Sequence, residues 1–240
     1  WSWREVGDFL AVLAAARPAA NHGYLVPHGT LRTFVMGSDA RPPTPDELAA
    51  MEAALDRALA QGALGLSTGL IYPPCCYAER EELIALCGVA ARHGGPLVVH
   101  IRSESDAILA GLDEVIAVCD AAGCALHISH WKIAGRANFD LVDAVIERVE
   151  EAIRRGVAVT ADQYPYAAGS TMMAAILPPW AHDGGADAAL ARLADVAIRA
   201  RIRDDMLAKG PLDWDSFWAW TGPEGIVISD LSSGRRPELL

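Results

Sequence analysis

The sequence predicts an α/β fold built on a parallel sheet, and within that class a (β/α)8 barrel of the TIM type, incomplete in this chain. One unit recurs: a helical pattern ends at glycine, an apolar run follows, and a polar residue closes the run. The closing residues lie 33, 30 and 32 residues apart, which is the length of a β-α unit. The alternative, a doubly wound dinucleotide-binding sheet, predicts a G-x-G-x-x-G turn that the sequence lacks, whereas polar strand ends are typical of barrel enzymes.

Short apolar runs mark the strands. Each follows a glycine just past a helix end, where positive φ is needed. They occupy residues 63–66, 96–99, 125–129 and 157–161. Because the runs are apolar throughout, they indicate a parallel sheet covered on both faces. We also expect an earlier strand at 23–26 and a later one at 225–229.

Helices fill the intervals between these runs. Residues 141–153 place apolar side chains at helical spacing, with charged residues opposite. Residues 81–91 and 106–121 have the same pattern. Thr44 followed by Pro45 predicts a capped helix start, with acidic residues in the first turn.

Composition narrows the class of protein. The chain has 240 residues, a net charge of −11 and 52% hydrophobic residues, which excludes disorder and argues against a nucleic-acid partner. No apolar run reaches the roughly 18 residues of a membrane helix, and no signal-peptide pattern is present. The five scattered cysteines, an odd number, indicate a reducing compartment rather than a disulfide framework. We therefore expect a cytoplasmic protein without membrane association.

The chain begins at Trp1 rather than methionine. We expect residues 1–240 to be the central part of a single barrel domain, with flanking parts of the fold absent.

Two histidines are candidate metal ligands. His100 and His130 close consecutive predicted strands, and neighbouring parallel strands lie about 4.8 Å apart. Their imidazoles can converge on one ion, for which zinc is the first expectation. The alternative is a pair of hydrogen-bonded histidines at strand ends.

The other histidines and the paired cysteines are expected to be structural. Strand alternation predicts that His127 faces the helices if His130 faces the barrel mouth. His28 closes an early strand, where packing and hydrogen bonding are favoured over a place in the site. The remaining residues sit in loops or at helix ends: His22, His93, His182, Cys75 and Cys76.

Lys132 lies two residues beyond His130. A compact ammonium beside a metal suits an anionic substrate group, although a surface lysine is the simpler interpretation. Tyrosine and serine hydroxyls in the segment 162–170, after the next strand, can join Lys132 around a carboxylate.

Several motifs in order carry a family resemblance. They are residues 63–74 (ALGLSTGLIYPP), 100–104 (HIRSE), 128–132 (ISHWK), 135–138 (GRAN), and 161–166 (ADQYPY) through 169–171 (GST). Together they resemble the N-acyl-D-amino-acid deacylases, or D-aminoacylases, of the amidohydrolase superfamily. The likeness runs from about His28 to Trp180.

The resemblance implies a hydrolase with one or two Zn²⁺ ions on a distorted barrel. It would cleave the amide of a small-molecule N-acyl-D-amino acid, giving a D-amino acid and a carboxylate. His100 and His130 match metal-binding histidines of the family. The residues that match those holding the substrate α-carboxylate are Lys132, Tyr164 and Ser170. Arg102 and Glu104 match positions that we expect to orient the neighbouring ligand.

The family also has features that the chain lacks. A His-x-His pair and a cysteine ligand are expected upstream of Trp1, so Cys75 and Cys76 are not assigned to that role. No segment matches the catalytic aspartate, and Asp230 is not assigned to it because it lies in a stretch that resembles a non-catalytic part of the family.

Two alternatives remain. One is an amidohydrolase of the hydantoinase or dihydroorotase type, acting on cyclic amides. The other is an inactive truncated fragment or a binding module made from half a barrel. In either case, an incomplete barrel leaves strand edges open, so we expect the isolated chain to be inactive and poorly soluble.

Overall fold

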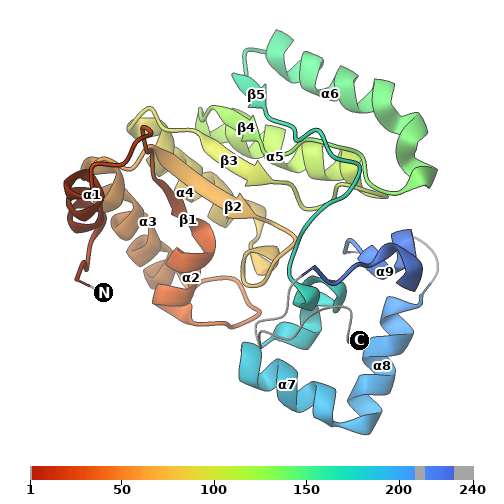
Figure 1. Ribbon diagram of the computed structural model, residues 1–240. Helices are drawn as coiled ribbons and strands as arrows, with labels where there is room; N and C mark the ends of the chain where they lie inside the picture. The colour runs from red at the N-terminus through yellow and green to blue at the C-terminus, as the bar shows by residue number, and fades with distance from the viewer. Residues whose placement is uncertain (1, 209–213, 230–240) are drawn as a thin grey trace.

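The computed structural model describes residues 2–208 and 214–229. Its five strands form one parallel sheet, in the chain order β1-β2-β3-β4-β5 (Figure 1). The strands are β1 (Leu25–Pro27), β2 (Gly65–Gly69), β3 (Leu97–His100), β4 (Leu126–Ile128) and β5 (Val159–Ala161). A doubly wound sheet would reverse its strand order. The parallel α/β prediction is confirmed, and the open arc of described strands fits part of a barrel without closing into one.

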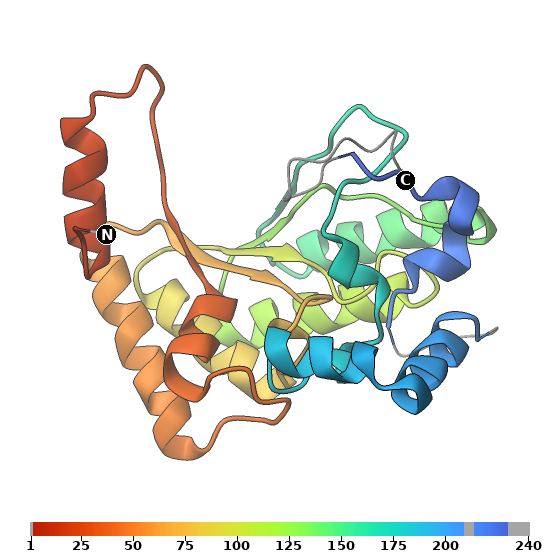
Figure 2. The same ribbon diagram turned by 60° about the horizontal axis from the view of Figure 1, so that its bottom comes forward.

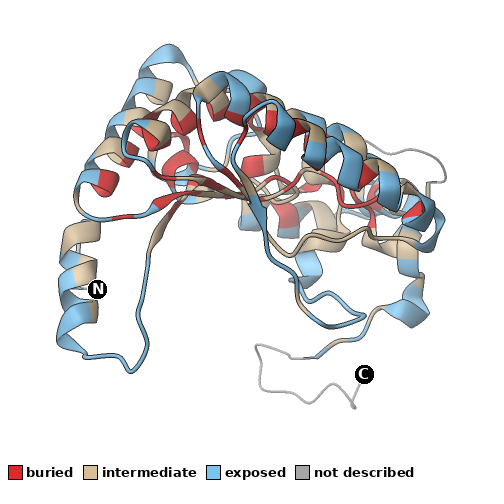
Figure 3. Ribbon diagram, turned by 90° about the horizontal axis from the view of Figure 1, so that it is seen from above, coloured by how far each residue is buried: buried red, intermediate tan, exposed pale blue. Residues whose placement is uncertain are grey.

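Four helices cover one face of the sheet. They are α3 (Pro45–Ala60), α4 (Arg80–Arg92), α5 (Ile108–Ala122) and α6 (Val142–Arg154), and each packs on the next. In Figure 3 the buried residues lie between these helices and the strands. Thr44 begins α3 with the expected cap, because its side chain and that of Glu47 bond each other's backbone amides.

Two shorter helices flank the start of the sheet. Helix α2 (His28–Met36) follows β1 directly and packs against α3. Helix α1 (Val6–Ala15) lies beside the end of α3, where Gln61 Oε1 accepts from the Gly7 amide at 3.0 Å.

Alternate strand residues form the core. Leu97 and Val99 of β3, with Leu126 and Ile128 of β4, are at most 1% exposed and belong to the cluster beneath the helices. The residues between them, including Val98 and His127, point to the opposite face of the sheet. That opposite face carries the candidate site.

The last described helices form a separate layer. They are α7 (Ala186–Ala194), α8 (Val196–Met206) and α9 (Phe217–Thr221), and they lie beyond the carboxyl ends of β2 and β3 (Figures 1 and 2). The Tyr77 hydroxyl, which follows β2, donates to the Pro179 carbonyl at 2.7 Å. This layer therefore packs near the sheet edge where the candidate site residues gather.

The predicted strand at 225–229 is wrong. Pro223–Gly225 form a short 3-10 turn, and the residues after it, to 229, pair with no described strand. Val227 is 84% exposed. A run of β-branched residues has a propensity for strand formation. Without a neighbouring strand, however, its backbone forms no inter-strand hydrogen bonds. Asp230 lies outside the described residues.

The far edge of the arc has uncovered apolar surface. Val145, Val149 and Ala152 of α6 are buried. The other members of its apolar face are 44–50% exposed: Val142, Ile146 and Ile153. Thr160 and Ala161 of β5 are also exposed.

Among the described helices, none combines the length and apolarity needed to cross a membrane.

Candidate metal site

The two candidate histidines face each other. His100 is the last residue of β3, and His130 lies two residues past the end of β4. His100 Nδ1 is 3.0 Å from His130 Nε2, and the ring centroids are 4.6 Å apart in an edge-to-face arrangement. The structure thus brings together at the carboxyl edge of the sheet two residues that are 30 apart in sequence.

A left-handed turn sets the direction of the His130 ring. Its φ is +39°, a conformation that non-glycine residues adopt rarely, although histidine does so more than most. The Asp162 carboxylate accepts from the His130 amide, and the Asp162 carbonyl accepts from the Trp131 amide at 2.8 Å. These bonds tie the turn after β4 to the residue that follows β5.

The expectation that His127 faces the helices is wrong. His127 shares a register position with Val98 and Thr160 on the opposite face of the sheet. Its ring nitrogens lie 2.8 Å from Thr160 Oγ1 and 3.0 Å from Asp162 Oδ2. Strand alternation fails here because β4 ends at Ile128, so the turn rather than strand parity places His130.

Glu104 joins the histidines to Lys132. Its Oε1 lies 3.1 Å from His130 Nδ1 and 3.8 Å from His100 Nδ1, and it accepts from Lys132 Nζ at 2.7 Å. Burial raises the pKa of Glu104, against the effect of its hydrogen bond to Lys132. A carboxylate behind a histidine is the arrangement that fixes the ring of a metal ligand.

The donor set fits a metal ion such as zinc. His100, His130 and Glu104 place one ligand atom each within 4.8 Å of the others. Two nitrogens bound to one tetrahedral zinc, each at about 2.0–2.1 Å, lie roughly 3.3 Å apart, close to the observed pair. The other nitrogen of the His100 ring, Nε2, is buried and has no hydrogen-bond partner among the described residues. Burial, with the charges of His130 and Lys132, lowers the pKa of His100 to about 3, so its ring is neutral at pH 7 and able to bind a metal.

Tyr164 reaches this cluster, whereas Ser170 makes no described contact with it. Lys132 Nζ is 5.3 Å from the Tyr164 ring centroid, a cation–π distance. A Cβ built on Gly169 would lie 3.6 Å from the Tyr164 hydroxyl, so the neighbour of Ser170 packs at that hydroxyl. Ser170 itself is exposed, and no described contact joins it to Lys132.

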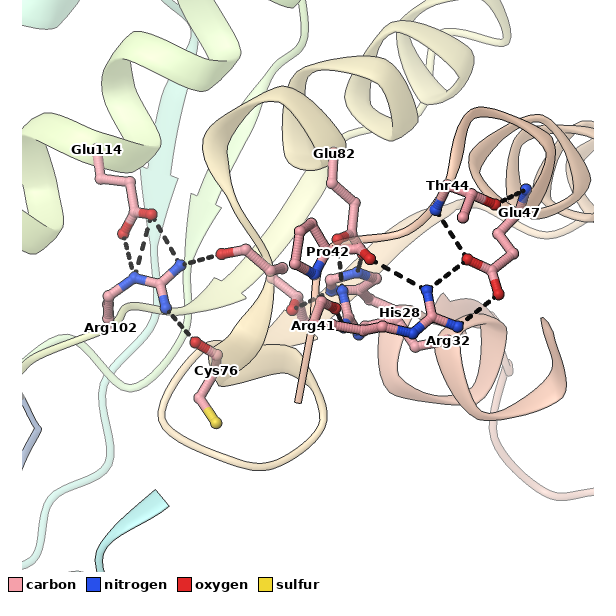
Figure 4. Close-up of polar contacts among 12 residues, drawn as sticks. His28, Arg32, Arg41, Pro42, Thr44, Glu47, Cys76, Glu82, Arg102 and Glu114 are labelled. Carbon is pink, nitrogen blue, oxygen red and sulfur yellow. Dashed lines mark hydrogen bonds and ion pairs between the residues drawn. The ribbon is translucent and has the colours of Figure 1, made fainter. Parts of the chain in front are cut away.

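Arg102 turns away from the histidines. It pairs with Glu114 of α5 at 2.8 Å and donates to the carbonyls of Cys76 and Ala78 at 2.8 and 2.9 Å (Figure 4). It therefore ties the loop after β2 to α5. Of the two residues expected to orient a ligand, only Glu104 contacts a histidine in the structure.

His28 sits in a buried polar network, where it packs and hydrogen-bonds. Its nitrogens lie 2.9 Å from Thr68 Oγ1 and 2.7 Å from Glu82 Oε1, and Arg32 also pairs with Glu82 (Figure 4). Burial opposes the charged form of His28, but hydrogen bonds to Cys75 and Glu82 outweigh it and raise the pKa of His28 to about 9.

Asp215 is a buried residue that sequence reasoning did not find. It accepts from Ser103 Oγ at 2.6 Å, Ser105 Oγ at 2.9 Å and the Glu104 amide at 2.7 Å. It therefore fixes the loop that carries Glu104. Asp215 lies more than 100 residues after this loop in the sequence and outside any local motif. The only signal for a hydrogen-bond acceptor here was the pair of serines that flank Glu104.

A hollow of about 770 Å³ opens in front of the histidines. His100, His130, Ser67 and Tyr72 are among its lining residues. It provides room for a small molecule at the carboxyl edge of the sheet, the place where barrel enzymes bind their substrates.

Comparison with known proteins identifies relatives of the chain. No protein-family model matches the chain. D-aminoacylase from Alcaligenes xylosoxydans xylosoxydans is 38% identical over 173 residues, which cover 72% of this chain and 36% of that protein. N-acyl-D-glutamate deacylase from the same organism is 42% identical over 169 residues, covering 70% and 35%. The chain thus spans about a third of the length of the curated relatives it matches.

The solved structures that resemble this chain belong to the same kinds of enzyme as these curated relatives. A D-aminoacylase crystal structure that defines a subset of amidohydrolases is 40% identical with a TM-score of 0.67, covering 70% of this chain and 35% of that one. N-acyl-D-glutamate deacylase from Bordetella bronchiseptica, in complex with zinc and a phosphonate inhibitor, is 38% identical with a TM-score of 0.66, covering 68% and 34%. A third structure addresses the binuclear metal centre of D-aminoacylase, with 40% identity and a TM-score of 0.68 over the same shares as the first.

Fold and similarity together indicate the class: the relatives of this chain are amidohydrolases, which are hydrolases that act on amide bonds. Within that class it is a homologue of the D-aminoacylases and N-acyl-D-amino-acid deacylases, over about 70% of its length. The family resemblance of the sequence motifs is thereby confirmed.

Proposed function

We propose that the protein catalyses zinc-dependent hydrolysis of N-acyl-D-amino acids, and that residues 1–240 form the central part of its barrel domain. The observation that carries the proposal is the facing pair His100 and His130, 3.0 Å apart, with Glu104 and Lys132 beside them. Relatives with D-aminoacylase and N-acyl-D-glutamate deacylase activity support the substrate class.

In the proposed site His100 and His130 hold the metal. When bound, zinc polarises an amide carbonyl and makes water more acidic. Glu104 Oε1 lies 3.1 Å from His130 Nδ1, and its negative charge favours a proton on that nitrogen, which leaves Nε2 for the metal. His100 stays neutral because it is buried beside cationic groups.

Lys132 is the proposed receptor of the substrate α-carboxylate. Its Nζ is half-buried and pairs with Glu104. A substrate carboxylate would therefore bind an ammonium group that already has Glu104 as a partner. The Tyr164 ring lies 5.3 Å from the ammonium, and Ser170 follows in the same segment. Anchoring the carboxylate fixes which enantiomer presents its amide to the metal.

The experiment is to express the complete reading frame that contains this chain and to measure amino-acid release. Substrates are N-acetyl derivatives of D- and L-amino acids, with a hydantoin and dihydroorotate as cyclic amides. We expect zinc-dependent turnover of the D-enantiomers at least about tenfold above the L-enantiomers, a preference of roughly 1.4 kcal/mol. Turnover of cyclic amides alone would replace the proposal with the hydantoinase type, and a folded but inert protein would refute catalysis.

A further inference from the structure

Three buried cysteines converge on the helical side of the sheet. Cys87 comes from α4, Cys119 from α5, and Cys124 from the segment leading into β4. Their side chains are 0%, 1% and 4% exposed, and their three sulfur atoms lie within 4.8 Å of one another. All three are free thiols.

This cluster is separate from the histidine site. Cys124 precedes β4, at the amino end of the strand, whereas His130 follows the carboxyl end. The cysteines also belong to the core cluster between the sheet and the helices α4 and α5, opposite to the face that carries His100. Neither the histidines nor Lys132 takes part in the cluster.

The surroundings of the sulfur atoms favour a soft cation. Among the described residues the cluster contains no histidine or carboxylate. Cys124 Sγ donates to the carbonyls of Gly95 and Ala125 at 3.4 and 3.5 Å. Thiolates select Zn²⁺, Cu⁺ and related ions over Mg²⁺ or Ca²⁺. Three sulfurs around one zinc-like ion at about 2.3 Å would lie roughly 4 Å apart, which small side-chain rotations can reach.

The thiols also interact with one another. Hydrogen bonds from Cys119 and Cys87 lower the pKa of the Cys124 thiol, while Cys119 and Cys124 raise the pKa of Cys87. A thiolate shared among three sulfurs in an apolar core is unfavourable without a counter-ion. One cation at the centre would satisfy all three.

We propose that Cys87, Cys119 and Cys124 bind one thiophilic d10 metal ion, Zn²⁺ or Cu⁺, as a structural site distinct from the histidine pair. The ion joins α4, α5 and the start of β4. Because the sulfurs are fully enclosed, it enters as the protein folds, and its binding free energy adds to folding stability.

The test uses the protein from its complete reading frame, unfolded and refolded with Cd²⁺ as a spectroscopic zinc substitute, and in parallel with Cu⁺. The variant is Cys119→Ala. The matched control is Cys76→Ala, a half-buried cysteine outside the cluster. We expect the variant to hold one equivalent of metal less than the wild type and the control, with a weaker thiolate-to-metal charge-transfer band. The wild type should also melt at higher temperature when refolded with metal.

Equal metal content in the wild type and Cys119→Ala would overturn the proposal. So would a disulfide between two of the three cysteines in the metal-free native protein, detected by mass spectrometry after alkylation. If Cys119→Ala does not fold, cadmium NMR of the wild type decides: a sulfur-rich resonance apart from the histidine site supports the proposal, and its absence refutes it. None of these readouts depends on deacylase activity.

Discussion

Glu104 is the residue through which the separate parts of the site meet. One carboxylate oxygen faces His130 and accepts from Lys132, and the same oxygen is 3.8 Å from His100. The metal-binding and substrate-binding roles proposed for these residues are therefore electrostatically linked. The motif at 100–104 indicated a supporting role for Glu104, but its contact with Lys132 depends on the turn after β4.

Replacing Lys132 by alanine separates the two roles. We expect Lys132→Ala to reduce turnover of N-acyl-D-amino acids by about 100-fold or more, because a charge-assisted contact to substrate of roughly 3 kcal/mol is lost. Zinc content should change little: the variant loses the contacts of Lys132 Nζ with His130 Nδ1 and with the His130 carbonyl, both at 3.0 Å, but Asp162 still holds the His130 turn. Kinetics together with metal analysis check this, with Arg148→Ala on exposed α6 as control. Equal loss of zinc and turnover would contradict the carboxylate role.

His28 makes stability depend on pH. Its pKa rises from 6.5 to about 9 on folding, so the folded state holds a proton that the unfolded state releases. That stabilisation is complete below about pH 6.5 and disappears as pH rises through about 9, a loss of up to about 3 kcal/mol. Urea unfolding across this range should show the decline in the wild type.

In His28→Gln the free energy of unfolding should fall much less as the pH rises, although Cys75 and Glu82 still titrate beside residue 28. The half-exposed His93, paired with Asp56 on the surface, provides the control His93→Gln, which should keep the wild-type slope. A wild-type stability that is level between about pH 6.5 and 9 would show that His28 is not charged in the folded protein.

At the scale of elements, strands and helices were predictable but the turns were not. Apolar runs and glycine stops placed β2 to β5 and α4 to α6 within a few residues, because burial and helix termination are local properties. His127 was assigned to the wrong face because the alternation of side chains along a strand was extended to His130. That residue lies in a turn after the end of β4, where the alternation no longer holds. The strand predicted at 225–229 was wrong for a different reason. A strand needs a neighbouring strand for its backbone hydrogen bonds, and the composition of the run does not show whether one is present.

The loop after β3 is a second element fixed from a distance. Asp215 accepts three hydrogen bonds from residues 103–105, so Asp215→Asn should loosen this loop at a cost of about 1–3 kcal/mol. Hydrogen exchange should show faster exchange of the Glu104 amide, and zinc affinity should fall with it. The exposed Asp204, paired with Arg203, gives the control Asp204→Asn. Unchanged protection of the Glu104 amide would rule out this anchoring role.

At the scale of the whole molecule, the described sheet is an open arc whose β5 end is exposed. The sequence indicated a barrel from its repeat and its polar strand ends, and the structure supports the parallel, sequentially ordered part of that prediction. Closure depends on contacts between strands far apart in the chain, which no local pattern in these 240 residues can reveal. The apolar face of α6 shows the consequence, since part of it remains uncovered.

We expect the 240-residue chain on its own to associate or precipitate, because an open strand edge and an exposed apolar helix face favour intermolecular contacts. Sedimentation and thermal melting of the purified chain, compared with the product of the complete reading frame, check this. A soluble monomer with one cooperative melting transition would contradict it. The comparison also shows whether the sheet edge at β5 is protected in the longer product.

The sequential strand order has a consequence for synthesis on the ribosome. Leu97 pairs in register with Leu66, Leu126 with Leu97, and Val159 with Leu126, so β3, β4 and β5 each pair with a strand about 30 residues earlier in the chain. A smaller separation in sequence favours faster folding than pairing between more distant strands. Each β-α unit can therefore dock on its predecessor soon after it emerges, and the arc grows in the direction of translation. The two histidines would meet only once the turn after β4 has left the exit tunnel.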